Sequence, residues 1–269
     1  MRFHAFRRLL AVTAMVGLCA SCGSSSTSSR TSTSSTGEAA STSGSASGAL
    51  NVFAAASLTA AFNDGKIGLG STNPNLTVTY NFAGSNALVT QIRQGAPADV
   101  FASADQKNMT TLFNARVVEA PVVFATNRLQ IAVAPTNPKG ITGLADLAKP
   151  GVSVVVAAPG VPAGDYTREV TAKLGISITP KSLETDVKSA LTKVTSGEVD
   201  ATVVYLTDVR AAGSKAVGVD ITEAQQPAIA YPIAIVKATK NRAAAEAFVR
   251  SATSGAVQQS LMRQGFIAP

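Results

Sequence analysis

Side chains that could carry out acid–base or nucleophilic chemistry near neutral pH are concentrated at the start of the chain. The only histidine is His4, and the two cysteines are Cys19 and Cys22. The rest of the sequence therefore offers no imidazole and no thiol, which argues against Ser-His-Asp and Cys-His catalysis and against zinc sites with the usual ligands. An enzyme using a carboxylate pair, such as Asp99 and Asp105 in ADVFASAD, remains an alternative. These acids read more simply as a strand-end residue and a helix N-cap.

The other candidates are small or hydroxyl-bearing residues at the starts of four predicted helices. They are Ala56-Ser57-Leu58, Gly84-Ser85, Pro162-Ala163-Gly164 and Thr185-Asp186-Val187. Small residues at a helix start let a ligand approach the free backbone N–H groups, and the helix dipole there favours an anion. Taken singly, none of these residues indicates a ligand. Serine is a common N-cap residue, which explains Ser57 and Ser85, and a further candidate, Tyr205 in ATVVYLTDV, suits a core position.

The elements that would position these residues alternate between strand-like and helix-like segments. The strand-like runs are 50–55, 76–83, 98–104, 129–135, 152–159, 201–206 and 228–237. Continuous valine-rich runs suit strands buried on both faces, and strand–helix alternation predicts largely parallel sheets with crossover helices. Two further helices, split at residues 253–255, are predicted to close the fold.

The first 22 residues are predicted to be a signal peptide. Three arginines precede the apolar run LLAVTAMVGLCA, which is followed by the small-residue stretch Ala20-Ser21-Cys22. CASC resembles the lipobox of bacterial lipoproteins, in which the last cysteine is acylated, although Cys19 stands where Leu or Val is usual. An ordinary secretory signal is the alternative. A disulfide is the weaker one, because Cys22 would be left unpaired after cleavage.

Residues 23–48 are almost entirely Ser, Thr, Gly and Ala, and we expect them to form a flexible tether. The 221 residues from 49 to 269 can bury a large core as one or two domains. Loss of three arginines with the signal peptide lowers the formal net charge from +7 to +4. The remaining basic residues are scattered singly, so no nucleic-acid partner is expected.

Six segments resemble, in chain order, the molybdate-binding proteins of bacterial ABC transporters. They are AAASLTAAF, FAGSNALVTQI, QGAPADVFASAD, PGVPAGDY, TDVKSAL and VVYLTDV. The resemblance implies an α/β, two-lobed periplasmic-binding-protein fold of type II, with a mainly parallel sheet flanked by helices in each lobe. Lobe I would comprise residues 49–124 and 231–269 and lobe II residues 125–230, with linkers near Ala125 and Tyr231.

The resemblance also implies the site. Ser57 and Ser85 would each donate a hydroxyl and a backbone N–H, Ala163 and Val187 would donate backbone N–H groups, and Tyr205 its hydroxyl. No cofactor is expected, and molybdenum would enter only as molybdate, through these same residues. Tungstate is nearly the same size, so we expect it to bind as well.

The expected function is capture of molybdate outside the cytoplasm and delivery to an ABC transporter permease and its ATPase subunit. The protein would be a monomer held at the outer face of the membrane by lipidated Cys22, and it would not be an enzyme. Binding of another oxyanion, such as sulfate or phosphate, is the second hypothesis and the carboxylate-pair enzyme the third. A purely structural lipoprotein is a further alternative.

The sequence departs from the family pattern in two places. Gly65, Gly68 and Gly70 are expected to shorten or loosen the first helix, since an interior glycine costs about 0.5–1 kcal/mol. Gly84 replaces a serine common in relatives, which removes one possible hydroxyl.

Overall fold

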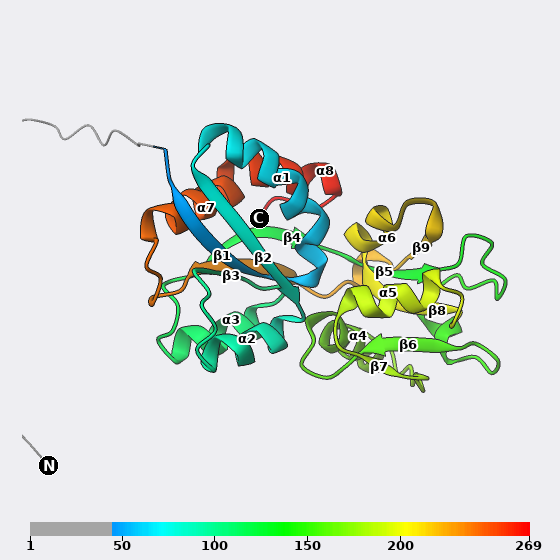
Figure 1. Ribbon diagram of the computed structural model, residues 1–269. Coiled ribbons are helices and arrows are strands. Elements are labelled where there is room, and N and C mark those ends of the chain that lie inside the picture. The colour runs from blue at the N-terminus through cyan, green and yellow to red at the C-terminus, as the bar shows by residue number, and fades with distance from the viewer. Residues whose placement is uncertain (1–44) are drawn as a thin grey trace, which may run out of the picture. The chain divides into compact units, whose positions relative to one another are not determined.

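A computed structural model describes residues 45–269 (Figure 1). The strands are β1 Gly48–Ala55, β2 Leu76–Ala83, β3 Val100–Ala102, β4 Val122–Asn127, β5 Leu129–Val133, β6 Val154–Ala157, β7 Leu183–Glu184, β8 Ala201–Tyr205, β9 Val217–Asp220 and β10 Ile229–Ile235. The helices are α1 Thr59–Thr72, α2 Ser85–Arg93, α3 Gln106–Asn114, α4 Pro162–Lys173, α5 Val187–Thr195, α6 Leu206–Ala212, α7 Arg242–Ser254 and α8 Ala256–Gln264. Four short 3₁₀ helices are η1 Ala56–Leu58, η2 Leu144–Ala148, η3 Gly213–Lys215 and η4 Glu223–Gln225.

The strands form two five-stranded sheets with matching topology, β2-β1-β3-β10-β4 and β7-β6-β8-β5-β9. In the first sheet, β1 pairs in parallel with β2 and β3, whereas β10 is antiparallel to β3 and β4. In the second, β6 pairs in parallel with β7 and β8, whereas β5 is antiparallel to β8 and β9. Four strands of each sheet therefore share one direction, which agrees with the predicted mainly parallel sheets.

The chain passes between the sheets twice, from β4 to β5 and from β9 to β10 (Figure 1). Helices lie against both sheets, and every residue of β6 and β8 is buried. This burial explains why their sequences are continuous valine-rich runs rather than alternating ones. Within residues 45–269, no helix is long and apolar enough to cross a membrane.

The ordered fold begins slightly before residue 49. Ala46 is buried, and its N–H donates to Asn73 Oδ1 at 2.8 Å. The N–H of Gly48, the first residue of β1, donates to the Asn75 carbonyl at 2.9 Å. These bonds fix the last residues of the predicted tether against the first sheet. The predicted signal peptide, Cys22 and the rest of the predicted tether lie outside the described residues.

The expected shortening of the first helix is not found, because α1 runs from Thr59 to Thr72. Two of its glycines face α8 at close range. A β carbon at Gly65 would lie 2.9 Å from the Cα of Val257, and one at Gly68 would lie 2.6 Å from the Cβ of Ala256. Close packing of α1 on α8 thus requires these glycines and offsets their conformational cost.

Gly70 differs from these two, since a β carbon there would meet no atom within 4 Å. Gly70→Ala should raise the free energy of unfolding by about 0.5–1 kcal/mol, because alanine loses less backbone entropy in a helix. Urea denaturation measures the change. Gly68→Ala is the matched control and should lower stability, and an equal gain in both variants would contradict the packing argument.

Candidate functional site

All five residues predicted to bind the anion line one cavity. The predicted residues in its wall are Ser57, Ser85, Ala163, Val187 and Tyr205, and the others are Ala55, Ala56, Ala83, Gly84, Ala104, Val161, Pro162 and Asp186. The structure thus brings together residues from distant parts of the sequence, whereas the predicted lipidation residue, Cys22, lies outside the described residues.

Each predicted residue lies where a strand gives way to a helix. Ser57 is in η1, directly after β1, and Ser85 is the first residue of α2, after β2. Ala163 is the second residue of α4, Val187 is the first of α5, and Tyr205 ends β8 before α6. The strands that lead into these turns run parallel within each sheet, so their carboxyl ends lie at one edge, where ligands of open α/β sheets bind.

The Tyr205 hydroxyl is buried, and it has no hydrogen-bond partner among residues 45–269. A buried polar group without a partner is costly, so such a group in a cavity wall marks a place for a ligand. Burial raises the pKa of Tyr205 well above its ordinary value, which keeps the phenol neutral and able to donate.

The two serine hydroxyls have different surroundings. Ser85 Oγ accepts a bond of 3.1 Å from the N–H of Ala104, which leaves the serine proton free to be donated. Ser57 Oγ lies 3.0 Å from Tyr231 Oη, on the buried strand β10. Both serines are nearly fully buried, so a ligand would meet them away from bulk water.

The backbone N–H groups come from the starts of α4 and α5. The Asp186 side chain caps α5, where Oδ1 accepts from the N–H of Lys188 at 2.8 Å and of Ser189 at 3.0 Å. The cap leaves the N–H of Val187 for a ligand. In α4, Pro162 has no N–H, so the first amide of the helix is that of Ala163. Asp186 is thus the N-cap of α5.

An ion pair connects α5, which begins at Val187, with α6, which follows Tyr205. Asp208 is fully buried, its Oδ2 accepts from the N–H of Tyr205 at 3.2 Å, and Lys188 Nζ lies 3.1 Å from its Oδ1. Burial raises the pKa of Asp208, and the Lys188 charge acts against that rise. The pair fixes the start of α6 relative to the start of α5, and sequence patterns alone did not indicate it.

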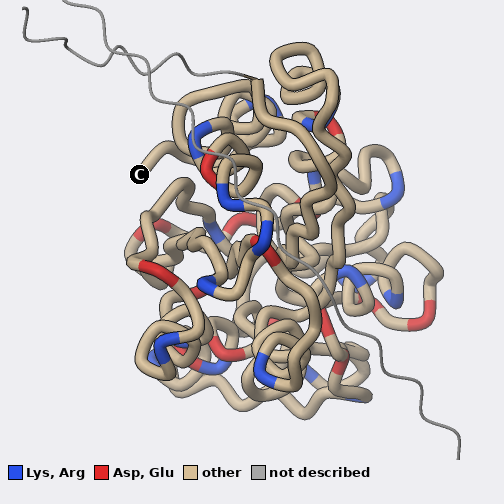
Figure 2. The backbone as a smooth tube through the Cα atoms, turned by 60° about the vertical axis from the view of Figure 1, so that its left-hand side comes forward, with Lys and Arg blue, Asp and Glu red and all other residues tan. Residues whose placement is uncertain are grey.

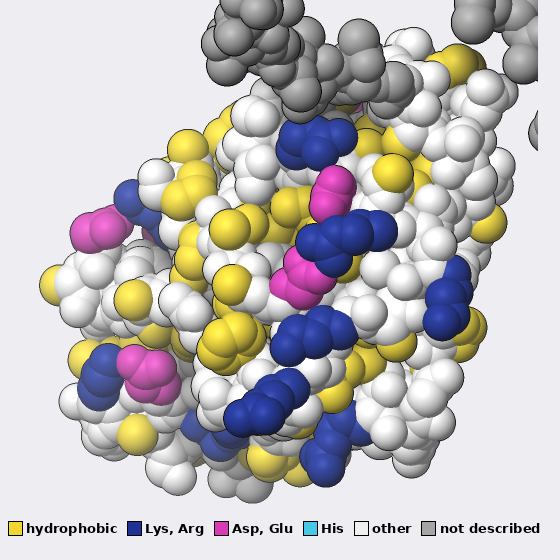
Figure 3. Space-filling view, turned by 90° about the vertical axis from the view of Figure 1, so that its left-hand side faces the viewer, with side chains coloured by type: hydrophobic (Ala, Val, Ile, Leu, Met, Phe, Trp, Pro, Cys, Tyr) yellow, Lys and Arg dark blue, Asp and Glu magenta, His cyan; other side chains and the backbone are white. Residues whose placement is uncertain are grey.

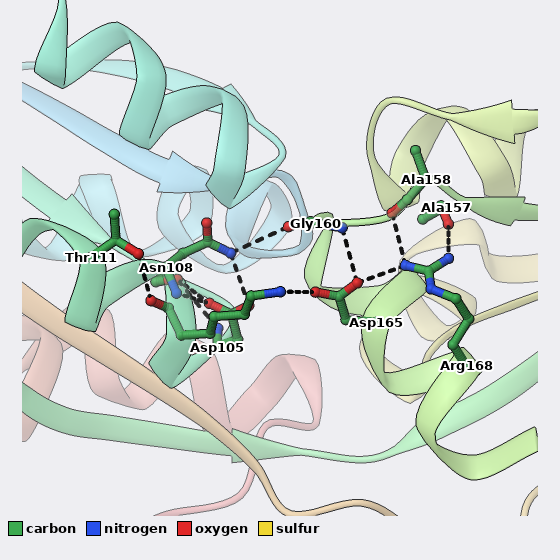
Figure 4. Close-up of polar contacts among 10 residues, drawn as sticks. Asp105, Asn108, Thr111, Ala157, Ala158, Gly160, Asp165 and Arg168 are labelled. Carbon is green, nitrogen blue, oxygen red and sulfur yellow. Dashed lines mark hydrogen bonds and ion pairs between the residues drawn. The ribbon is translucent and has the colours of Figure 1, made fainter. Parts of the chain in front are cut away.

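Polar contacts also bridge the two sides of the cavity (Figure 4). Asn108, on α3, donates from Nδ2 to the Gly160 carbonyl at 3.3 Å. Lys107 Nζ lies 2.9 Å from Asp165 Oδ2, on α4. Asp165 also accepts from the N–H of Gly160 at 2.9 Å. These contacts join the loop before α4 to the helix packed on the first sheet.

The carboxylates considered for an enzymatic role have structural partners instead. Asp99 Oδ2 accepts from the N–H of Asn51 at 2.8 Å, and its Oδ1 accepts from the Thr239 hydroxyl at 2.5 Å. Asp105 caps α3 by accepting from the N–H of Asn108 at 2.9 Å, which confirms its predicted role. Neither acid lines the cavity. Residues 45–269 contain no cluster of three His, Cys, Asp or Glu residues suited to a metal ion.

Comparisons with known proteins agree with this geometry. The sequence profile of the bacterial extracellular solute-binding proteins matches residues 50–267. The chain is 42% identical over 219 residues to the molybdate-binding protein ModA of Mycobacterium tuberculosis, covering 81% of this chain and 84% of that protein. It is 31% identical over 227 residues to the putative ABC transporter substrate-binding lipoprotein YvgL of Bacillus subtilis, covering 81% and 86%.

A solved structure gives the same result for the fold. The substrate binding domain of a putative molybdenum ABC transporter from Clostridium difficile matches with a TM-score of 0.62 at 30% identity. The match covers 82% of this chain and 99% of that domain. The predicted fold class, the α/β solute-binding fold with two mainly parallel sheets flanked by helices, is confirmed.

The unpaired Tyr205 hydroxyl leads to a stability prediction. Without added oxyanion, Tyr205→Phe should change the free energy of unfolding by less than about 0.5 kcal/mol, since no hydrogen bond is lost. Tyr231→Phe should lower it by about 0.5–1.5 kcal/mol, since the Tyr231 hydroxyl is bonded. Urea denaturation compares the two variants. A larger loss for Tyr205→Phe than for Tyr231→Phe would show that the Tyr205 hydroxyl has a protein partner.

Proposed function

Since the chain belongs to the bacterial extracellular solute-binding protein family, we propose that it binds molybdate outside the cytoplasm and delivers it to an ABC transporter. The observation that carries the proposal is the buried Tyr205 hydroxyl, which has no partner in the described part of the chain and shares its cavity with Ser57, Ser85 and two helix starts. The identity to a molybdate-binding protein over most of both chains supports the choice of anion. The site would bind and release its ligand, with no covalent chemistry.

The cavity suits a fully ionised anion because its walls offer donors. Asp186 is the one acid among the described lining residues, and it is fully occupied by the protein. Its Oδ1 accepts two backbone N–H groups, and its Oδ2 accepts from the Ser189 hydroxyl at 2.9 Å and from the Thr185 hydroxyl at 3.4 Å. Hydrogen phosphate would need an acceptor for its proton, and this carboxylate is not available for that purpose. Phosphate is therefore disfavoured.

Sulfate and tungstate carry the same charge as molybdate, so the distinction among them rests on size. Sulfate is smaller and would leave some donors too far away to bond, which weakens it as an alternative. Tungstate is nearly the same size as molybdate and should bind with similar affinity. Molybdenum would be held only as the oxyanion, through hydrogen bonds to its oxygens, with no direct ligand to the metal.

Movement of two lobes would allow the ligand to enter. We assign residues 49–124 and 231–269 to one lobe and residues 125–230 to the other, with linkers near Ala125 and Tyr231. The contacts from Asn108 to Gly160 and from Lys107 to Asp165 would then form on closure. Closure around the anion would exclude water and strengthen each hydrogen bond.

The partners follow from the same assignment. The ligand would pass to a permease and its ATPase subunit, and lipidated Cys22 would hold a monomer at the outer face of the membrane. The name of the Bacillus subtilis relative, an ABC transporter substrate-binding lipoprotein, supports both points. Figure 2 shows acidic and basic residues interspersed along the described chain. On the face in Figure 3, basic side chains lie beside acidic ones in the upper part and without acidic neighbours in the lower part.

Thermal-shift measurements with molybdate, tungstate, sulfate and hydrogen phosphate test the proposal. Molybdate and tungstate should raise the melting temperature, and a rise with sulfate or phosphate alone would overturn the choice of anion.

Ser57→Ala should weaken molybdate binding about 10- to 150-fold, which corresponds to about 1.5–3 kcal/mol for a lost charge-assisted hydrogen bond. Calorimetry gives the affinities, with the exposed Ser71→Ala as the control. An unchanged affinity for Ser57→Ala would remove Ser57 from the site.

Gly84 allows a separate test of closure. A β carbon there would lie 2.7 Å from the carbonyl oxygen of Thr185, on the opposite side of the cavity. Gly84→Ala should raise the Kd for molybdate about 5- to 150-fold. The added methyl group would destabilise the closed, ligand-bound form by about 1–3 kcal/mol through overpacking. Gly143→Ala, where a β carbon would meet nothing within 4 Å, is the control. Equal affinities for the two variants would argue against this close approach in the bound state.

A further inference from the structure

The Tyr231 hydroxyl is a buried polar group next to a predicted ligand residue, and the following inference rests on the proposed function. Tyr231 is fully buried on β10, and its Oη lies 3.0 Å from Ser57 Oγ. The distance alone does not say which hydroxyl donates. The direction matters because it decides whether Ser57 offers the cavity a proton or a lone pair.

Asn127, at the end of β4, determines that direction. Its Oδ1 accepts from the N–H of Arg128 at 2.9 Å, so the amide nitrogen must face the other way. From there Nδ2 donates to Thr207 Oγ1 at 3.0 Å and to Tyr231 Oη at 3.4 Å. An amide nitrogen can only donate, so Tyr231 accepts from Asn127.

Tyr231 must then donate its own proton to Ser57. If Ser57 instead donated to Tyr231, the Tyr231 proton would have no acceptor among residues 45–269. Because Tyr231 is fully buried, water could not accept that proton either, and an unpaired buried donor is costly. Burial raises the pKa of Tyr231 well above its ordinary value, so the proton stays on the phenol. With one lone pair of Ser57 engaged by Tyr231, the serine proton is left to point into the cavity.

Aromatic packing holds Tyr231 in this position. Its ring meets those of Phe124 and Phe266 edge to face, with centroids 6.4 and 5.3 Å apart. It also packs against the ring of Tyr205, at 5.8 Å and 67°. Tyr231 therefore contacts two of the proposed ligand donors, Ser57 through its hydroxyl and Tyr205 through its ring.

We propose that Tyr231 and Asn127 are positioning residues that make Ser57 a hydrogen-bond donor to the anion, and that they thereby favour fully ionised oxyanions over protonated ones. Ser85 is oriented in the same sense by a different group, the N–H of Ala104. Without Tyr231, the Ser57 hydroxyl is free to rotate and to accept a hydrogen bond from the protonated oxygen of a ligand such as hydrogen phosphate.

Calorimetry on the full chain tests the proposal with Tyr231→Phe, which keeps the ring and removes the hydroxyl. The Kd for molybdate should rise about 2- to 12-fold, as expected for the loss of one hydrogen bond. Competition by hydrogen phosphate should become stronger relative to molybdate, a change in selectivity that a loss of stability alone would not cause. Tyr80→Phe, which removes a hydroxyl bonded to the Phe62 carbonyl, should change neither value.

A double-mutant cycle separates the positioning role from a general one. If Tyr231 acts through Ser57, Tyr231→Phe should have no further effect on molybdate affinity in a Ser57→Ala background. Asn127→Ala should likewise have no further effect on molybdate affinity in the Ser57→Ala background. This variant replaces Tyr231→Phe in the test if Tyr231→Phe folds poorly. Additive losses, or an unchanged ratio of the two anions, would overturn the inference. Failure of the unmodified protein to bind molybdate would instead overturn the proposed function.

Discussion

The proposed site would depend on hydrogen-bond donors held in fixed directions, because no basic side chain is among the described residues lining the cavity. A dianion can be held without a countercharge only if each donor is oriented before the ligand arrives, since reorientation would cost much of the binding energy. Hydrogen bonds within the protein would orient the donors in this way. Asp186 accepts hydrogen bonds from the amides of Lys188 and Ser189, so the amide of Val187 is left for the ligand. The N–H of Ala104 donates to Ser85 Oγ, so the Ser85 proton is left for the ligand as well.

The repeated topology explains how donors from both halves of the sequence reach one place. Each sheet has the same strand order, with parallel strands whose carboxyl ends lead directly into helices. A site assembled at these strand ends includes residues that follow strands of both sheets, such as Ser57 after β1 and Val187 after β7. The same arrangement puts the chain crossings near the cavity. Asn127 ends β4 at one crossing and Tyr231 lies on β10 after the other, so groups at the crossings can orient a donor.

The sequence predicted those parts of the fold and site that depend on local patterns. The runs at 152–159 and 201–206 contain the strands β6 and β8, because continuous burial leaves a valine-rich signature. The strand β4 was missed although VVFATN is mostly apolar, and β7 is too short to leave a pattern. Resemblance supplied the five cavity residues. Tyr231 and Asn127 could not be assigned a role, because their contacts join residues 174 and 104 positions apart.

The most direct measurement is the position of molybdenum in crystals grown with molybdate, located by anomalous scattering. The account predicts one strong peak in the cavity, surrounded by oxygens within hydrogen-bonding distance of Tyr205 Oη, Ser57 Oγ and Ser85 Oγ. The backbone nitrogens of Ala163 and Val187 should complete the shell. A peak elsewhere on the protein, or a peak in the cavity whose oxygens do not contact Tyr205, would contradict the account.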